Sequence, residues 1–173
     1  MHKKDLLFQG KYRIPSARWE RWDYRNPELY FVTICTKKMK PQFGEIISGS
    51  MKLNQLGQFA YDYMANMNDR KENARVINHI VMPNHVHAII KLTNSIQHKA
   101  TNHFGPLLAG SLSSLINHYK GSVTKHAKSK NLNWNGWHER FHDHIIRDVN
   151  QFDKINNYIS SNPLNWQSDR YYL

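Results

Sequence analysis

The sequence has one cysteine, few acidic residues relative to basic ones, and no long apolar run. Because Cys35 has no second cysteine to pair with, an intramolecular disulfide and a cysteine-based zinc site are both excluded. Cys35 lies in the apolar stretch YFVTICT, so we expect a buried, unreactive thiol. No apolar run reaches the length of a transmembrane helix, and the first residues lack the apolar core of a secretion signal. We therefore expect a cytoplasmic protein that does not enter a membrane.

The shortage of acidic residues leaves a large excess of positive charge. The chain has 24 Lys and Arg against 13 Asp and Glu, a formal net charge of +11. Its 173 residues, 40% of them hydrophobic, suffice for one domain with a real core. A basic balance this large indicates a polyanionic partner, most simply nucleic acid. The aromatic residues, 12% of the chain, offer stacking surfaces to unpaired bases.

Hydrophobic periodicity predicts strands mixed with helices. We expect strands over 29–37, 74–83 and 85–92, a hairpin within 43–54 turning at Ser48-Gly49, helices over 54–71, 107–130 and 150–163, and an extended segment within 131–148. This order predicts an α+β fold, with a mainly antiparallel sheet covered by helices. Residues 1–28 are basic and aromatic and are interpreted as an N-terminal arm. Residues 29–173 form the domain.

The stretch VMPNHVHAII places two histidines in an otherwise apolar strand. His85 and His87 are two residues apart, roughly 6.6 Å along a strand, so they share one face while Val86 points into the core. Neutral imidazoles side by side can bind one metal ion, and ligand softness alone favours zinc or another late transition metal. Taken alone, the pair is better explained as two half-exposed histidines on a solvated face. A metal site also needs a third ligand from elsewhere in the chain.

A second pair of polar residues lies on the last predicted helix. Tyr158 and Asn162 are four residues apart, so they are neighbours on one helix face. Asn162 precedes Pro163, which disfavours the α conformation and predicts that Asn162 sits at the helix end with its amide free to turn. A tyrosine beside a metal can serve as a nucleophile. From the residues alone, Tyr158 packing in the core and Asn162 capping the helix is the stronger interpretation.

The motifs YFVTICT, MPNHVHAIIKL and W…RFHDHIIRD…INNYISSNPLNW together resemble the single-tyrosine HUH transposases, in particular the REP-associated tyrosine transposases. The resemblance extends from about Arg13 to Trp166, with the motifs in the family's order and spacing. It implies a ferredoxin-like or RRM-like sheet, with the paired histidines on a central strand and the tyrosine on a nearby helix.

The resemblance also implies an activity, namely a metal-dependent transposase or endonuclease that acts on single-stranded or hairpin DNA. Position by position, it makes His85, His87 and Asn162 the metal ligands and Tyr158 the nucleophile. The implied products are a 5′-phosphotyrosine and a free 3′-OH, and the implied ion is Mg²⁺ or Mn²⁺. Relatives act as monomers or as homodimers, so both remain open.

Basic and aromatic residues are the predicted contacts to DNA. The arm contributes Arg13, Arg18, Trp19, Arg21 and Trp22, and the domain contributes Lys120, Arg140 and Arg147. Relatives commonly have Trp-Gln where this chain has Trp137-His138, so no role is carried over to His138. His144 matches a recurrent family histidine, and we expect it to make a structural hydrogen bond.

Two other functions are compatible with the same sequence. A non-catalytic module could bind hairpin DNA or RNA on an RRM-like sheet, and it would have no need of a tyrosine beside the histidine pair. A hydrolytic metallonuclease would use water as its nucleophile and would form no covalent adduct with DNA. Tyr158 is therefore the residue that distinguishes the three functions.

Overall fold

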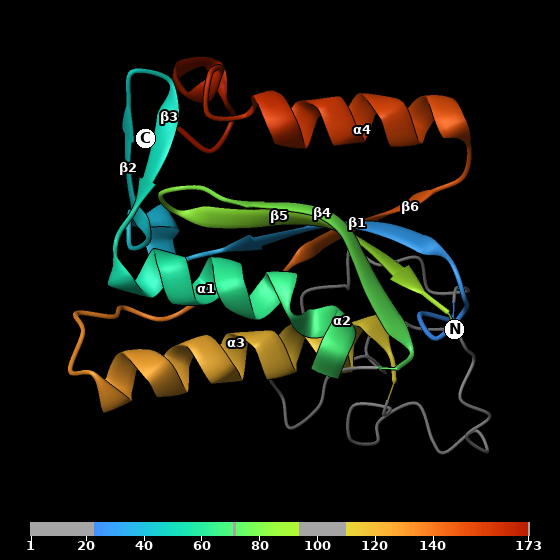
Figure 1. The fold of residues 1–173 in the computed structure, drawn as a ribbon, viewed down its shortest axis with the longest axis horizontal. Helices are drawn as coiled ribbons and strands as arrows, with labels where there is room; N and C mark the ends of the chain where they lie inside the picture. The colour runs from blue at the N-terminus through green and yellow to red at the C-terminus, as the bar shows by residue number, and fades with distance from the viewer. Residues whose placement is uncertain (1–22, 71, 94–109, 173) are drawn as a thin grey trace, which may run out of the picture.

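The structure is a computed structural model that describes residues 23–70, 72–93 and 110–172 (Figure 1). Four antiparallel strands form the main sheet: β1 (Leu29–Cys35), β4 (Ala74–Val81), β5 (His85–Leu92) and β6 (His142–Ile146). Their order in the sheet is β4-β5-β1-β6. With α1 (Gln55–Ala65) after β1 and α3 (Leu112–Ser129) after β5, the chain follows the β-α-β-β-α-β pattern of ferredoxin-like folds. The predicted α+β fold is therefore confirmed.

Helices cover both faces of the main sheet. Figure 1 shows α1 and α3 against one face and α4 (Val149–Ser161) against the other. Alternate residues of β5 divide between these two layers: Val86, Ala88 and Ile90 join the core under α1 and α3, while Ile89 packs with Ile159 of α4. Seven of the eight residues of β5 are buried. The central strand that carries the two histidines is therefore enclosed by protein on both sides.

The hairpin predicted within 43–54 is present as β2 (Gly44–Ile47) and β3 (Ser50–Leu53), a separate two-stranded sheet. Its turn has positive φ at both Ser48 (49°) and Gly49 (71°), the combination that two-residue hairpin loops favour. The chain just before the hairpin is fixed to the turn between β4 and β5, because the Pro83 carbonyl accepts hydrogen bonds from the backbone N–H groups of Gln42 (2.7 Å) and Phe43 (3.1 Å).

The helix boundaries follow polar caps. The predicted cap Asn54 accepts a hydrogen bond from the backbone N–H of Gly57 at 2.9 Å, and Ser111 and Asp148 cap α3 and α4 in the same way. The structure ends α1 at Ala65 and continues into a short α2 (Met67–Arg70), and short 3-10 helices lie at Lys37–Met39 and Trp166–Ser168. None of the helices in the described ranges combines the length and apolar character needed to cross a lipid bilayer.

The extended segment predicted within 131–148 is present as β6, and Lys120 of α3 holds the irregular stretch that precedes it. The Lys120 ammonium donates to the carbonyl of His138 at 2.8 Å and also lies 3.4 Å and 3.5 Å from the carbonyls of Glu139 and Arg140. Lys120 is only 8% exposed. The structure thus contradicts the predicted phosphate contact at Lys120, because its charge is turned inward onto backbone carbonyls.

Replacing Lys120 with methionine is expected to lower the free energy of unfolding by about 1.5–3 kcal/mol, because the charged donor is lost from buried carbonyls. Urea denaturation measures this change. Lys125→Met is the matched control, since Lys125 is exposed on the same helix. Unchanged stability together with weaker DNA binding and a smaller salt dependence would restore a phosphate contact at Lys120.

The single cysteine is buried, as expected from its sequence context. Cys35 is 5% exposed at the end of β1, and burial raises the pKa of its thiol to about 11, although the charges of Arg170 and Lys120 oppose the shift. At pH 8 very little of the thiol is ionised, and the thiolate is the reactive form. The sequence-based prediction of a buried cysteine is confirmed.

We therefore expect iodoacetamide to alkylate Cys35 at pH 8 roughly 100-fold or more slowly in the folded protein than in urea. The folded-state rate should keep rising about tenfold per pH unit from pH 8 to 10, because both values lie below the thiol pKa. Mass spectrometry of timed samples measures both rates. Equal rates in the folded and unfolded protein would show that the thiol is accessible.

Candidate active site

The two histidines lie on the face of β5 that is covered by α4. His85 is paired with Cys35 and His87 with Thr33 across the β1–β5 ladder. Their rings lie 4.4 Å apart between centroids, and the two residues are 0% and 1% exposed. The sequence-based alternative of two half-exposed histidines on a solvated face is therefore wrong. Polar rings buried this deeply need hydrogen-bond partners, and each of the two imidazoles has at least one.

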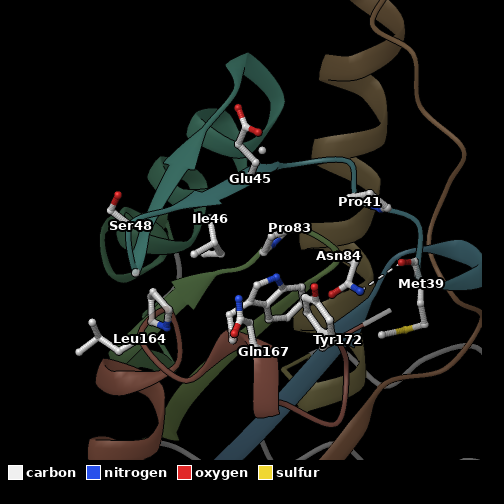
Figure 2. Close-up of a pocket in the computed structure, with 14 residues that line it drawn as sticks. Met39, Pro41, Glu45, Ile46, Ser48, Pro83, Asn84, Leu164, Gln167 and Tyr172 are labelled. Atoms are coloured by element: carbon white, nitrogen blue, oxygen red, sulfur yellow. Dashed lines mark hydrogen bonds between the residues drawn. The ribbon is translucent and has the colours of Figure 1, made fainter.

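His85 is oriented by its neighbour Asn84. The Asn84 side-chain amide donates to the carbonyls of Met39 (3.1 Å) and Tyr171 (2.8 Å), which fixes its Oδ1 toward Nδ1 of His85 at 2.9 Å. Figure 2 shows the bond from Asn84 to Met39. Because an amide oxygen only accepts, Nδ1 of His85 carries the proton and Nε2 carries a lone pair. That Nε2 is buried and has no hydrogen-bond partner among the described residues.

His87 connects the sheet to α4. Its Nδ1 lies 2.9 Å from the Thr33 hydroxyl, and its Nε2 lies 3.2 Å from the phenol oxygen of Tyr158. Tyr158 also donates to Oδ2 of Asp169 at 2.8 Å. The phenol has a single proton and can donate to only one acceptor at a time. With the phenol proton directed to Asp169, Nε2 of His87 has a lone pair for another ligand only in the tautomer that carries its proton on Nδ1.

The structure brings Asn162 to the same cluster in a conformation that the sequence did not predict. Asn162 lies in the α region (φ −55°, ψ −42°) despite the proline that follows it, so the expectation of a non-helical residue is wrong. The side chain is 1% exposed, and its Nδ2 donates to Oδ2 of Asp169 at 2.6 Å. Its Oδ1 is buried without a hydrogen-bond partner in the described part of the chain.

Asp169 is a member of the cluster that sequence reasoning missed. One carboxylate oxygen accepts from both Tyr158 and Asn162, and the other accepts from the backbone N–H of Tyr171 at 2.7 Å. Asp169 comes directly after the 3-10 helix Trp166–Ser168, in a segment without helical or strand periodicity. The segment returns over the histidines, with the Tyr171 ring 4.7 Å from that of His85.

Burial dominates the electrostatics of the cluster. It lowers the pKa of His85 to about 4 and the pKa of His87 well below its usual value, so both imidazoles are neutral at pH 7. Burial, together with the hydrogen bond to Asp169, raises the pKa of the Tyr158 phenol. Hydrogen bonds from Tyr171, Tyr158 and Asn162 outweigh burial and lower the pKa of Asp169. The site therefore holds neutral nitrogen donors beside one carboxylate.

These residues fit a divalent metal ion. Nε2 of His85 and Oδ1 of Asn162 are both buried electron-pair donors without a partner among the described residues, which is costly unless a ligand satisfies them. In the described residues no three His, Cys, Asp or Glu side chains form a metal-binding group, and Oδ1 of Asn162 is the further protein donor that the cluster offers. His85 donates to Asn84 and Asn162 donates to Asp169, and these hydrogen bonds orient the two side chains as the hydrogen-bond partners of ligands do in metal sites.

Replacing Asp169 with alanine is expected to weaken Mn²⁺ binding by roughly 10- to 100-fold, because Asn162 loses the partner that fixes its amide. The amplitude of the free Mn²⁺ signal in electron paramagnetic resonance measures the affinity. Asp153→Ala is the matched control, since Asp153 is an exposed carboxylate on α4. Equal affinities for Asp169→Ala and the wild type would contradict the role of Asp169.

The predicted DNA contacts are only partly placed. Arg13, Arg18, Trp19, Arg21 and Trp22 lie outside the described residues. Arg140 and Arg147 are exposed at the two ends of β6, a strand at the edge of the sheet, and their contact with DNA stays a prediction.

The two histidines near β6 are also placed. His144 makes the hydrogen bond expected of it, with its Nε2 3.3 Å from the side-chain oxygen of Gln151 in the first turn of α4. His138 is exposed, and its Nδ1 accepts a hydrogen bond from the backbone N–H of Arg140 at 3.3 Å. This bond is local to the loop before β6.

The fold and the cluster together define an α+β protein of the ferredoxin-like type with a histidine-tyrosine site. The solved structure of a REP-associated tyrosine transposase bound to a REP hairpin shares this fold, with a TM-score of 0.54 and 20% identity over 87% of this chain and 74% of that one. No protein-family model matches the sequence. An uncharacterized protein of Haemophilus influenzae is 30% identical over 172 residues, 95% of this chain and 96% of that protein. The chain belongs to the family of that Haemophilus protein.

Proposed function

We propose that the chain is a metal-dependent enzyme that nicks single-stranded hairpin DNA and transfers strands through Tyr158. The observation that carries this proposal is the 3.2 Å distance between the Tyr158 oxygen and Nε2 of His87, two residues 71 positions apart. Tyr158 is also 37% exposed, so a substrate can reach it. The fold shared with a transposase bound to a hairpin and the net charge of +11 support a DNA substrate.

In the proposed reaction the Tyr158 oxygen attacks the phosphorus of a backbone phosphate. The bond between phosphorus and the 3′ oxygen breaks, leaving a 5′-phosphotyrosine and a free 3′-OH. The phenol loses its proton and the departing 3′ oxygen takes one up. Attack of a 3′-OH on the phosphotyrosine reverses these steps, rejoins DNA and frees Tyr158. Because each step exchanges one phosphoester for another, no nucleotide cofactor is needed.

Each residue of the cluster has a defined part in this proposal. His85, His87 and Asn162 would hold Mg²⁺ or Mn²⁺, which when bound polarises the scissile phosphate. Asp169 fixes the positions of Tyr158 and Asn162 through its two hydrogen bonds. Burial keeps both histidines neutral and available as ligands. In this proposal the nucleophile and the ligands of the cation come from the same chain.

A covalent-adduct assay tests the proposal. The protein is incubated with labelled hairpin DNA from the flanks of its own gene, with Mn²⁺ or Mg²⁺, and run on a denaturing gel. We expect a slower protein–DNA band that disappears with chelator and when the oligonucleotide is annealed to its full complement. Cleavage without an adduct would indicate attack by water. Tight binding without cleavage, once the flanks have been fully searched, would indicate a non-catalytic binding module.

A further inference from the structure

An open cavity of about 560 Å³ lies beside the cluster, between the hairpin β2–β3 and the segment that follows α4 (Figure 2). This volume is in the range of about 300–1,000 Å³ typical of small-molecule sites. Ile46 lines the cavity from the hairpin, and Gln167 and Tyr172 line it from the opposite side. The hairpin tip approaches Leu164 at one side of the cavity, where a Cβ on Gly49 would come within 2.8 Å of the leucine side chain.

The charge of the lining argues for an uncharged occupant. None of the described residues that line the cavity is lysine or arginine, and one, Glu45, is acidic. In Figure 2 the Glu45 carboxylate points away from Gln167 and Tyr172. Proteins bind the phosphates of nucleic acids mainly through cationic side chains and N–H donors. The cavity is therefore unsuited to phosphate even though the protein as a whole is strongly basic.

The side chains of the cavity match the features of a nucleobase. Trp166 and Tyr172 meet edge to face at 5.4 Å between ring centroids, and Tyr172 is 48% exposed, so its ring is open to stacking. The Gln167 side chain is exposed and makes no hydrogen bond within the described residues. An amide offers one acceptor and two donors, which pair well with a base edge. The cavity thus combines an exposed aromatic ring with an amide that has no hydrogen-bond partner in the described part of the chain.

The cavity is also connected to the histidine cluster. Asn84 lines the cavity and accepts the hydrogen bond from His85, and the Trp166 ring lies 5.9 Å from the His85 ring. We propose that this cavity binds one unpaired base of the single-stranded DNA, on a nucleotide adjacent to the phosphate that reacts at Tyr158. This inference rests on the proposed function. It adds a protein site that selects the cleavage position by a base outside the hairpin stem.

Equilibrium binding with chelator present tests the base site without any cleavage. A hairpin oligonucleotide with single-stranded flanks is compared with versions in which each flanking nucleotide in turn is abasic. In the wild-type protein we expect one position whose abasic form weakens binding by roughly 5-fold or more, the lower end of a base–aromatic stacking contribution. For the double variant Gln167→Ala, Tyr172→Ala the same abasic change should alter affinity by less than about 2-fold.

Two further variants complete the test. Ile46→Trp, which fills the cavity from the hairpin, should also remove the abasic effect, and Tyr61→Ala, an exposed tyrosine of α1 outside the cavity, should retain it. An abasic effect that persists in the cavity variants, or is absent at every position, overturns the base site. The adduct assay is independent of this result. If the adduct forms but no abasic effect is lost in the cavity variants, only the base site is wrong. If the cavity variants lose the abasic effect but no adduct forms, the base site is supported and only the covalent chemistry is wrong.

Discussion

The substitution Tyr158→Phe is expected to reduce formation of the covalent protein–DNA adduct at least 10³-fold, below detection on a denaturing gel. The variant keeps the ring, which lies edge-on to Phe31 at 6.2 Å and 5.2 Å from the His87 ring. It loses only the hydroxyl, and with it the attacking atom and the hydrogen bonds to Asp169 and His87. The substitution therefore tests the nucleophilic role of the hydroxyl while the packing of the ring is kept.

Two observations make this result decisive. Far-ultraviolet circular dichroism and hairpin binding should match those of the wild type, because the phenol is partly exposed and the ring contacts remain. Mass spectrometry of the wild-type adduct should locate the DNA on the peptide that contains Tyr158. An undiminished adduct in Tyr158→Phe, or a modification on the neighbouring Tyr171, would show that the assignment of the nucleophile is wrong.

The second large effect is expected for His85→Ala, which should weaken Mn²⁺ binding at least 100-fold and reduce adduct formation accordingly. The substitution removes a neutral nitrogen donor whose lone pair is buried and has no other partner in the described part of the chain. Isothermal titration calorimetry measures the affinity. A second readout is thermal unfolding: excess Mn²⁺ should raise the Tm of the wild type, since ligands stabilise the state that binds them, and should not raise that of His85→Ala.

His79 provides the matched control for this experiment. It is a histidine of the adjacent strand β4 whose buried Nε2 has no hydrogen-bond partner in the described ranges, but it packs against Tyr61 of α1, on the opposite side of the sheet. His79→Ala is therefore expected to leave Mn²⁺ affinity within about 2-fold of the wild type. Equal losses of Mn²⁺ affinity in both variants would mean that histidine content or general destabilisation, rather than the cluster, explains the binding.

The elements predicted well from the sequence are those in which buried residues recur at a regular spacing or a capping residue marks the start. The alternation in β5 separated His85 and His87 from Val86, and Asn54 marked the start of α1 through a local hydrogen bond. These signals are local, because a strand period of two and a capping side chain act within a few residues. The succession of strands and helices along the chain, and from it the α+β class, could be predicted from such segments.

The errors arose where tertiary contacts override local preference. Asn162 keeps a helical conformation before proline because its side chain is anchored to Asp169, seven residues further on. Lys120 looked like a surface charge on a basic helix, yet carbonyls of a loop 18 to 20 residues away surround its ammonium. Asp169 carried no signal at all, since an isolated acid in an irregular segment becomes informative only when the fold brings it to Tyr158.

The packing of α4 on its own sheet has a kinetic consequence. The helix that carries Tyr158 and Asn162 contacts β4 and β5 of the same chain, so one polypeptide supplies the whole histidine-tyrosine cluster. If the cluster is the active centre, turnover per chain should stay constant on dilution, and the rate should be first order in protein. A mixture of Tyr158→Phe and His85→Ala chains should not recover activity, because neither could complete the other.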